Sequence, residues 1–276
     1  MSKLRKPRMA ICYDFDGTLA SGSMQEYDFI PKLKMTSKGF WDEVGKRSRS
    51  QQADQIITYM CIMLEKALSS NDVKITRDAF VNYGRTIDLF PGVRQWFKRI
   101  KRYAKRQGVI LEHYIISSGI REMIEGTRIA NEFKKIFASS FIYDQHNVAR
   151  WPGLAINYTT KTQFLFRINK GVLNVWDNEK INKYIPKQNR PIPFTRMIYI
   201  GDGSTDVPCM KLVKDQGGYS IAVYKPNSWK KKQAKNLLKE DRVNFVLPAD
   251  YSSKKQLDKK VKAIIKKIAA DFRLHK

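Results

Sequence analysis

The chain has 276 residues, which suits one α/β core carrying a smaller inserted or appended unit. Hydrophobic residues make up 42% and aromatic residues 12% of the chain, which excludes a disordered protein, and 15 Gly and 10 Pro exclude a collagen-like or linker-dominated one. Lys and Arg number 52 against 26 Asp and Glu, a formal net charge of +26 that favours anionic partners: nucleic acid, anionic membranes or phosphorylated molecules.

Cysteine usage and hydropathy indicate the compartment. Cys12, Cys61 and Cys209 are odd in number and have no paired spacing, which argues against a disulfide framework and against a cysteine zinc site. The apolar run after the basic start is interrupted by Asp14 and Asp16, so we expect no signal peptide. No stretch approaches the roughly 18 apolar residues of a membrane span. We therefore expect a soluble, cytoplasmic protein without membrane partners.

The first half of the chain begins with a strand and then turns helical. An apolar run predicts a strand at 9–13. From 21 to 88 no convincing strand occurs, and helical periodicity predicts helices at 39–48, 53–69 and 76–87. Ser-Gly-Ser at 21–23 and Pro-Gly at 91–92 mark the exit from the main domain and the return to it. Two short linkers around a helical insert are what a hinged lid needs.

The second half alternates strands and helices. Bounded apolar runs predict strands at 112–116, 137–142, 197–200 and 219–223. The 3.6-residue periodicity predicts helices at 92–107, 120–136, 160–169, 204–214 and 228–239. This alternation predicts an α/β fold, a Rossmann-like doubly wound parallel sheet with an inserted α-helical cap domain. We expect residues 1–20 and 89–250 to form the core, 21–88 the cap, and 251–276 a basic helix packed on the core.

The positive charge is concentrated in three segments, 1–8, 94–106 and 229–276. Residues 94–106 carry seven basic residues and no acid along one side of an amphipathic pattern. The simplest interpretation of this face is solvated surface. Nucleic acid remains open as a partner, although no sequence motif indicates it. Nothing in the sequence indicates the oligomeric state.

The strongest candidate site begins at the end of the first predicted strand, in the sequence DFDGTL. In an extended chain alternate side chains share a face, so Asp14 and Asp16 point toward one site at the carboxyl edge of the sheet. Gly17 then allows a tight turn. Two carboxylates beside an apolar strand repel each other, so a divalent cation is the natural third member.

A second acidic pair follows the fourth predicted strand, in GDGSTD. If that strand lies beside the first, Asp202 reaches the same edge as Asp14, with Asp206 close behind. Mg²⁺ accepts carboxylates, water and phosphate oxygen, so it suits this all-oxygen set better than zinc does.

Two further elements favour an anion at this edge. Ser117 and Ser118 end the second predicted strand beside a glycine that opens a helix, where amides and hydroxyls attract phosphate. Lys161 begins a predicted helix and can hold phosphate charge as a point cation. Lys170, followed by a glycine, is the alternative for this role, and we favour Lys161 because it starts the helix.

DFDGTL, ISSG, a lysine at a helix start and GDGSTD, in this order, resemble the four motifs of the haloacid dehalogenase superfamily, in its phosphatase branch with an inserted helical cap. The resemblance spans about residues 9 to 225. It implies that Asp14 is the nucleophile, that Asp16 is the general acid and base, and that Lys161 neutralises charge on nucleophile and phosphate.

The same resemblance assigns the ligands of metal and phosphate. It implies that Asp14, the Asp16 carbonyl and Asp202 hold Mg²⁺, with Asp206 supporting the metal waters or the lysine. It also implies that Ser117, the Ser118 amide and Lys161 bind the phosphoryl oxygens. The long proline-containing stretch 174–195 departs from compact members of the superfamily and puts the position of the third motif in question.

We therefore expect a Mg²⁺-dependent phosphoric monoester hydrolase that acts through an aspartyl-phosphate on a small phosphorylated metabolite. One alternative keeps the chemistry but transfers the phosphoryl group to another acceptor, as a phosphotransferase or mutase does. The other is a basic nucleic-acid-binding protein, or a nucleic-acid-end phosphatase, on the same scaffold. The cap carries no motif that identifies a substrate.

Overall fold

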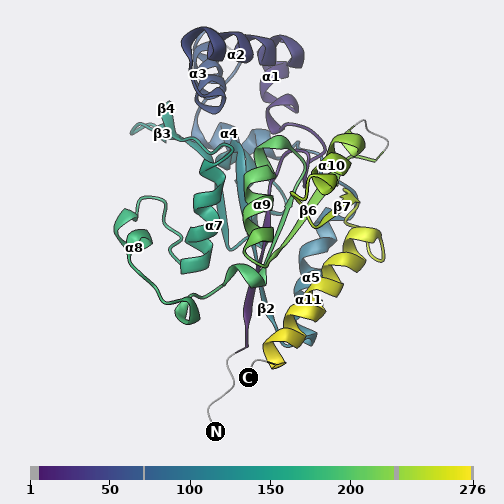
Figure 1. Ribbon diagram of the computed structural model, residues 1–276. Helices are drawn as coiled ribbons and strands as arrows, with labels where there is room; N and C mark the ends of the chain where they lie inside the picture. Colours follow the sequence, from purple (N-terminus) through teal and green to yellow (C-terminus); the bar gives the residue numbers. More distant parts are fainter. Residues whose placement is uncertain (1–5, 71, 227–229, 275–276) are drawn as a thin grey trace.

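The computed structural model of the chain describes residues 6–70, 72–226 and 230–274 (Figure 1). Part of the basic N-terminal segment, the first residues of the predicted helix 228–239 and the last two residues of the predicted helix 251–276 lie outside these ranges.

One sheet forms the centre of the molecule, with its strands in the order β4-β3-β2-β1-β5-β6-β7. Their bounds are β1 (Arg8–Tyr13), β2 (Ile110–Ile120), β3 (Lys135–Tyr143), β4 (Ala149–Leu154), β5 (Met197–Gly201), β6 (Tyr219–Tyr224) and β7 (Phe245–Pro248). Every neighbouring pair is parallel except β3 and β4, which are antiparallel. The predicted α/β fold with a doubly wound sheet is thereby confirmed, and β5 lies beside β1 as the candidate site requires.

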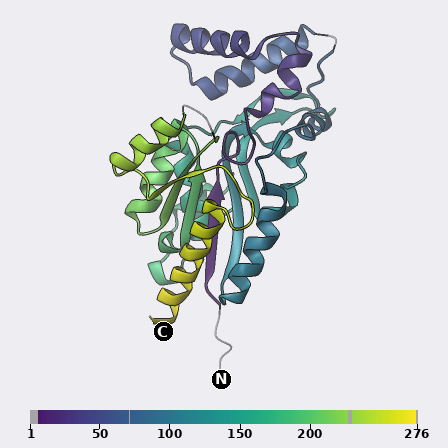
Figure 2. The same ribbon diagram turned by 90° about the vertical axis from the view of Figure 1, so that its right-hand side faces the viewer.

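Alternation along β1 explains why both faces of the sheet are covered. Met9 and Ile11 belong to one apolar cluster, and Ala10 and Cys12 belong to the other. A strand that is buried on both faces needs a helical layer on each side. The helices α5 (Val93–Arg106) and α11 (Gln256–Leu274) cover the first face, and α7 (Thr160–Lys170), α9 (Val207–Asp215) and α10 (Lys230–Lys239) cover the second (Figures 1 and 2).

Between β1 and α5 the chain is helical, with no strand among its described residues. Its elements are η1 (Met24–Glu26), α1 (Phe29–Lys32), α2 (Ser37–Gln51), α3 (Gln55–Leu68) and α4 (Arg77–Gly84). Figure 1 shows α1, α2 and α3 beyond the carboxyl ends of the strands, at the top of the view. The helix α4 lies closer to the sheet and packs against α6 (Arg121–Glu125). The two connections to the core run together, because the amide of Ser21 donates to the carbonyl of Asp88 at 3.1 Å.

The helix predicted at 120–136 is wrong. The structure has only the five-residue α6 and the short 3-10 helix η2 (Ala130–Glu132) before β3 begins at Lys135. Gly126 ends α6 where the backbone of the cap segment approaches closely, since a Cβ on Gly126 would lie 1.8 Å from the carbonyl oxygen of Val81. The apolar residues that produce the helical pattern are instead buried by a turn, so tertiary packing overrides periodicity here.

Two edge strands, β4 and β7, are missing from the sequence prediction. The β4 sequence ARWPGL contains proline and glycine, and the four-residue β7 ends in proline. Both residues are unfavourable in central strands but tolerated at an edge, where one row of backbone groups needs no partner. The remaining short elements are α8 (Asn178–Asn182), η3 (Lys187–Asn189), η4 (Phe194–Arg196) and η5 (Ser204–Asp206).

Two compositional expectations also have structural counterparts. Cys12, Cys61 and Cys209 are all free thiols, and the first and last are buried. Across the described ranges, no helix combines the length and the apolar character that crossing a bilayer requires.

Candidate active site

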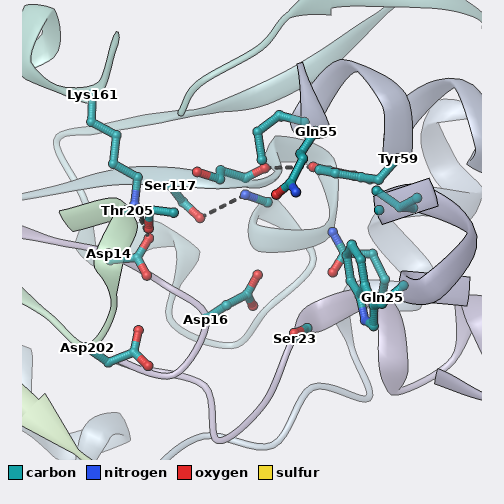
Figure 3. Close-up of a pocket in the computed structure, with 16 residues that line it drawn as sticks. Asp14, Asp16, Ser23, Gln25, Gln55, Tyr59, Ser117, Lys161, Asp202 and Thr205 are labelled. Carbon is teal, nitrogen blue, oxygen red and sulfur yellow. Dashed lines mark hydrogen bonds and ion pairs between the residues drawn. The ribbon is translucent and has the colours of Figure 1, made fainter. Parts of the chain in front are cut away.

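The carboxyl ends of β1 and β5 bring the predicted aspartates together. Asp14 follows β1 directly, and its amide donates to the Ile200 carbonyl of β5 at 2.9 Å. Asp202 follows β5, and Asp14, Asp202 and Asp206 each offer an oxygen within 4.8 Å of the others. Figure 3 shows Asp14, Asp16 and Asp202 around one space at this edge of the sheet. The adjacency of two strands far apart in sequence therefore creates the acidic cluster.

Lys161 lies in the first turn of α7 and is the cation of this cluster. Its Nζ donates to Asp14 Oδ1 at 2.9 Å and to Asp206 Oδ1 at 2.7 Å, and the side chain is 0% exposed. Lys170, the alternative, lies at the opposite end of α7 and donates to the carbonyls of Ile181 and Lys183. The structure thus brings Lys161, and not Lys170, to Asp14.

Asp206 is held by hydrogen bonds on both of its oxygens. Oδ1 accepts from Lys161 and from the Tyr199 hydroxyl at 2.8 Å, and Oδ2 accepts from the amides of Asp202 at 3.2 Å and Gly203 at 3.3 Å. These contacts leave Asp206 positioned to orient the lysine and the 202–206 loop. A metal would be held by Asp14 and Asp202 instead, with Asp206 behind them.

The donor set fits Mg²⁺ better than a softer ion. Asp14 and Asp202 both offer carboxylate oxygens, and Asp14 uses only Oδ1 to bind Lys161. Gly17 lets the two loops approach each other, because its φ is +73° and a Cβ there would lie 2.2 Å from Asp202 Oδ2. Any larger side chain would push Asp202 away from the cluster.

Burial controls the electrostatics of the cluster. Burial raises the pKa of Asp14 to about 7, and Asp206 adds to the rise while Lys161 opposes it. The pKa of Asp16 is also well above its usual range, first through burial and then through the charge of Asp14. Carboxylates that are costly to ionise in this environment gain most from a nearby cation, which agrees with a divalent metal site.

Asp16 makes its hydrogen bond to the cap segment. Its Oδ1 accepts from the Met24 amide at 3.0 Å, so the side chain turns toward the cap (Figure 3). A carboxyl group with a raised pKa holds a proton that it can deliver to a leaving oxygen.

Ser117 and Ser118 form the opposite wall at the end of β2. Ser117 Oγ accepts from the Gly119 amide at 3.0 Å, and Ser118 Oγ is buried without a partner among the described residues. A helix does begin just after them, at Arg121, as expected, but α6 has only five residues, and Ser117 and Ser118 themselves belong to β2. Hydroxyl and amide groups of an irregular strand end are therefore what this wall offers an anion.

These residues line a cavity of about 340 Å³ between the sheet edge and the cap. Thr205, with Oγ1 3.4 Å from Lys161 Nζ, joins the core side of the cavity, and Gln25 and Tyr59 join the cap side. Sequence reasoning missed all three. Thr205 stands inside the GDGSTD motif and could have been included, whereas Gln25 and Tyr59 carry no local signal.

Sequence comparison decides the family. The family profile described as haloacid dehalogenase-like hydrolase matches residues 11–211, most of the chain. The chain belongs to the haloacid dehalogenase-like hydrolase family. The resemblance drawn from the four motifs is confirmed, and so is the expectation of an enzyme of a hydrolase family.

One sequence relative and two solved structures show what this haloacid dehalogenase-like hydrolase is similar to. An uncharacterized protein of Borreliella burgdorferi is 29% identical over 274 residues, 90% of this chain and 93% of that protein. A HAD-family hydrolase from Salmonella enterica serovar Typhi has a TM-score of 0.56 at 15% identity, covering 88% of this chain and 68% of that one. A substrate-bound phosphoserine phosphatase has a TM-score of 0.54 at 13% identity, covering 94% and 99%. At these identities the structural likeness establishes a shared fold.

Proposed function

We propose that this hydrolase is a Mg²⁺-dependent phosphoric monoester hydrolase that forms an aspartyl-phosphate on Asp14. The observation that carries the proposal is the contact of fully buried Lys161 with both Asp14 and Asp206, beside Asp16 and the hydroxyls that end β2. A carboxylate next to a fixed cation, a second protonatable carboxyl and anion-binding donors are the groups that phosphoryl transfer needs. The phosphatases among the structural neighbours have the same fold and add support.

In the first step a carboxylate oxygen of Asp14 attacks phosphorus. The phosphorus–oxygen bond to the alcohol breaks, and Asp16 gives its proton to the leaving oxygen. Lys161 balances the negative charge on Asp14 and on the phosphoryl oxygens, and the wall formed by Ser117 and Ser118 donates to those oxygens. When bound at Asp14 and Asp202, Mg²⁺ supplies additional positive charge to the phosphoryl group.

In the second step water replaces the alcohol. Asp16, now deprotonated, takes a proton from a water molecule as its oxygen attacks phosphorus, and the bond to Asp14 breaks. Inorganic phosphate leaves, and Asp14 returns as the carboxylate. The cavity of about 340 Å³ lies at the low end of the range for small-molecule sites, so we propose a small phosphorylated substrate and not a polymer end.

Hydrolysis of an aryl phosphate tests the proposal. The wild-type protein should release inorganic phosphate with Mg²⁺ and lose this activity when a chelator is added. Asp14→Asn should abolish turnover without changing the circular dichroism spectrum, because the amide is nearly isosteric but is a poor nucleophile. Full turnover by Asp14→Asn would contradict the mechanism. Transfer of phosphate to an added alcohol in place of water would indicate a phosphotransferase.

A further inference from the structure

The cap side of the active-site cavity is electrically neutral. Eight residues of the cap segment line it, from η1 and the residue before it and from α2 and α3, and none of these eight carries a charge. All the charged side chains around the cavity belong to the predicted catalytic set: Asp14, Asp16, Lys161 and Asp202. The part of a substrate that extends beyond the phosphate therefore meets a wall without counter-ions.

Acidic groups close to this wall are already committed to holding it in place. Glu26 Oε1 accepts from the Trp41 indole at 2.8 Å and from the Ser37 hydroxyl at 2.7 Å. Asp54 caps α3 by accepting from the amides of Ile56 and Ile57. These carboxylates fix the first turn of α3 and the indole, and neither of them is among the residues that line this cavity.

Most of this wall is apolar or aromatic. Trp41 packs edge-to-face on Tyr59 with ring centroids 5.8 Å apart, and Val44 and Ile56 lie beside them on the cavity lining. The Tyr59 hydroxyl donates to the Ser118 carbonyl at 2.6 Å, which ties α3 to the phosphate wall. The aromatic surface is thereby held at a set distance from the reacting groups.

Gln25 is one of three polar residues without an aromatic ring in this wall, with Ser23 and Gln55, and it is the one whose side-chain oxygen is buried without a partner among the described residues. It lines the cavity, is only 2% exposed, and its Oε1 accepts no hydrogen bond from a described residue. Figure 3 shows Gln25 across the cavity from Asp14 and Lys161, beside Tyr59. A buried carbonyl oxygen without a donor costs free energy that a bound donor can recover. A hydroxyl group of a ligand is the simplest such donor.

We propose that this hydrolase acts on phosphate monoesters of neutral alcohols that carry a further hydroxyl group, which donates to Gln25 while the carbon skeleton packs on Trp41 and Ile56. The inference rests on the proposed hydrolase function and adds the substrate class. Esters whose alcohol bears a carboxylate or an ammonium group are disfavoured, because their charge would be buried against the neutral wall without a partner.

Phosphoserine belongs to the disfavoured class, since its ester lies next to both an ammonium and a carboxylate group. The name of the structural neighbours therefore does not predict the substrate of this chain. The common fold positions the phosphate, whereas the cap side chains select what is attached to it.

A matched pair of substrates tests the inference on the wild-type protein. Glycerol 3-phosphate and 3-phosphoglycerate share a three-carbon skeleton and differ in a hydroxymethyl group against a carboxylate. We expect kcat/KM for glycerol 3-phosphate to be larger by about tenfold or more, and larger than that for phosphoserine by a similar factor. Equal or inverted preference would overturn the inference.

Variants test the role of Gln25. Gln25→Leu should lower kcat/KM for glycerol 3-phosphate about tenfold more than for propyl phosphate, which has no second hydroxyl. The nearly isosteric Gln25→Glu preserves the packing and should raise the ratio of phosphoethanolamine to glycerol 3-phosphate turnover, because it adds a counter-ion for the ammonium group. Gln51→Leu, at an exposed position ending α2, is the matched control and should leave these ratios unchanged.

The outcomes separate the two proposals. If neither an aryl phosphate nor any other ester is hydrolysed, the proposed function fails and the substrate class falls with it. If aryl phosphate is hydrolysed but the charged esters match the neutral diol ester, or if both Gln25 variants leave the ratios unchanged, only the substrate class fails.

Discussion

Lys161→Met is the most demanding test of how this site is held together. The lysine is fully buried, and its Nζ bonds Asp14 at 2.9 Å and Asp206 at 2.7 Å. Burial alone would lower its pKa, but the two carboxylates raise it above the usual range, so the side chain is a cation in the folded protein. Methionine fills a similar volume but leaves the carboxylates of Asp14 and Asp206 without the positive charge of the lysine.

Removing one partner from a buried charge pair costs about 3–5 kcal/mol of unfolding free energy, and two carboxylates lose their partner here. Burial already raises the pKa of Asp14 to about 7 in the wild-type protein, above that of an unfolded aspartate, about 3.9, and without the opposing charge of Lys161 this pKa rises further. The folded variant then binds more protons than the unfolded chain, so its stability falls as pH rises. The deficit relative to wild type should therefore be smaller at pH 5 than at pH 8.

Urea denaturation of both proteins at the two pH values measures this deficit. Lys170→Met is the matched control, since Lys170 is on the same helix but donates only to main-chain carbonyls, and its loss should cost about 1 kcal/mol without this pH dependence. Lys161→Met should also lower hydrolysis about a hundredfold or more. Similar stability losses in the two variants, or a deficit in Lys161→Met that is constant with pH, would refute the electrostatic reasoning.

Two further predictions concern a glycine and a histidine. Gly17→Ala should raise the Mg²⁺ concentration needed for half-maximal hydrolysis about tenfold or more, because φ is +73° at Gly17 and the new Cβ would displace Asp202. Gly203→Ala is the control, since a Cβ there would have nothing within 4 Å and the Mg²⁺ requirement should not change. Equal Mg²⁺ requirements of the two variants would contradict this reasoning. Burial, and after it the charge of Lys101, lowers the pKa of His113 well below 6.5. Below pH 6.5 this imidazole is therefore protonated in the unfolded chain but stays neutral in the folded protein. Unfolding free energy should then fall by about 1.4 kcal/mol per pH unit below pH 6.5 from this group, and urea titrations that give His113→Gln the same acid slope would show that another group is responsible.

Local sequence was sufficient for the catalytic motifs and for most core elements. Asp14, Asp16, Asp202 and Asp206 follow apolar strands, and the predicted strands beside them are present as β1 and β5. A buried parallel strand is a continuous apolar run, and polar residues directly after its carboxyl end stand out against that run. Such signals are contained in a few consecutive residues, so they can be recognised without the fold.

Errors arose where packing between distant segments decided the conformation. The apolar pattern at 120–136 is periodic, but Gly126 meets the backbone at Val81 and the segment folds as a short helix and a turn. The edge strands β4 and β7 depend on an existing sheet for their pairing. Hydrophobic periodicity shows that residues are buried, but it does not by itself show whether they are buried as part of a helix or of a turn.

The sequence by itself determined the α/β alternation, the helical insertion and the pair of aspartate motifs, because strand burial and carboxylate spacing are local properties. Only the tertiary structure decided that Lys161 and not Lys170 reaches Asp14, and that Gln25 faces the cavity with an oxygen that no described residue satisfies. Both depend on how helices pack across the sheet edge. A side chain's environment there is created by residues more than a hundred positions away, as the contact between Lys161 and Asp14 illustrates.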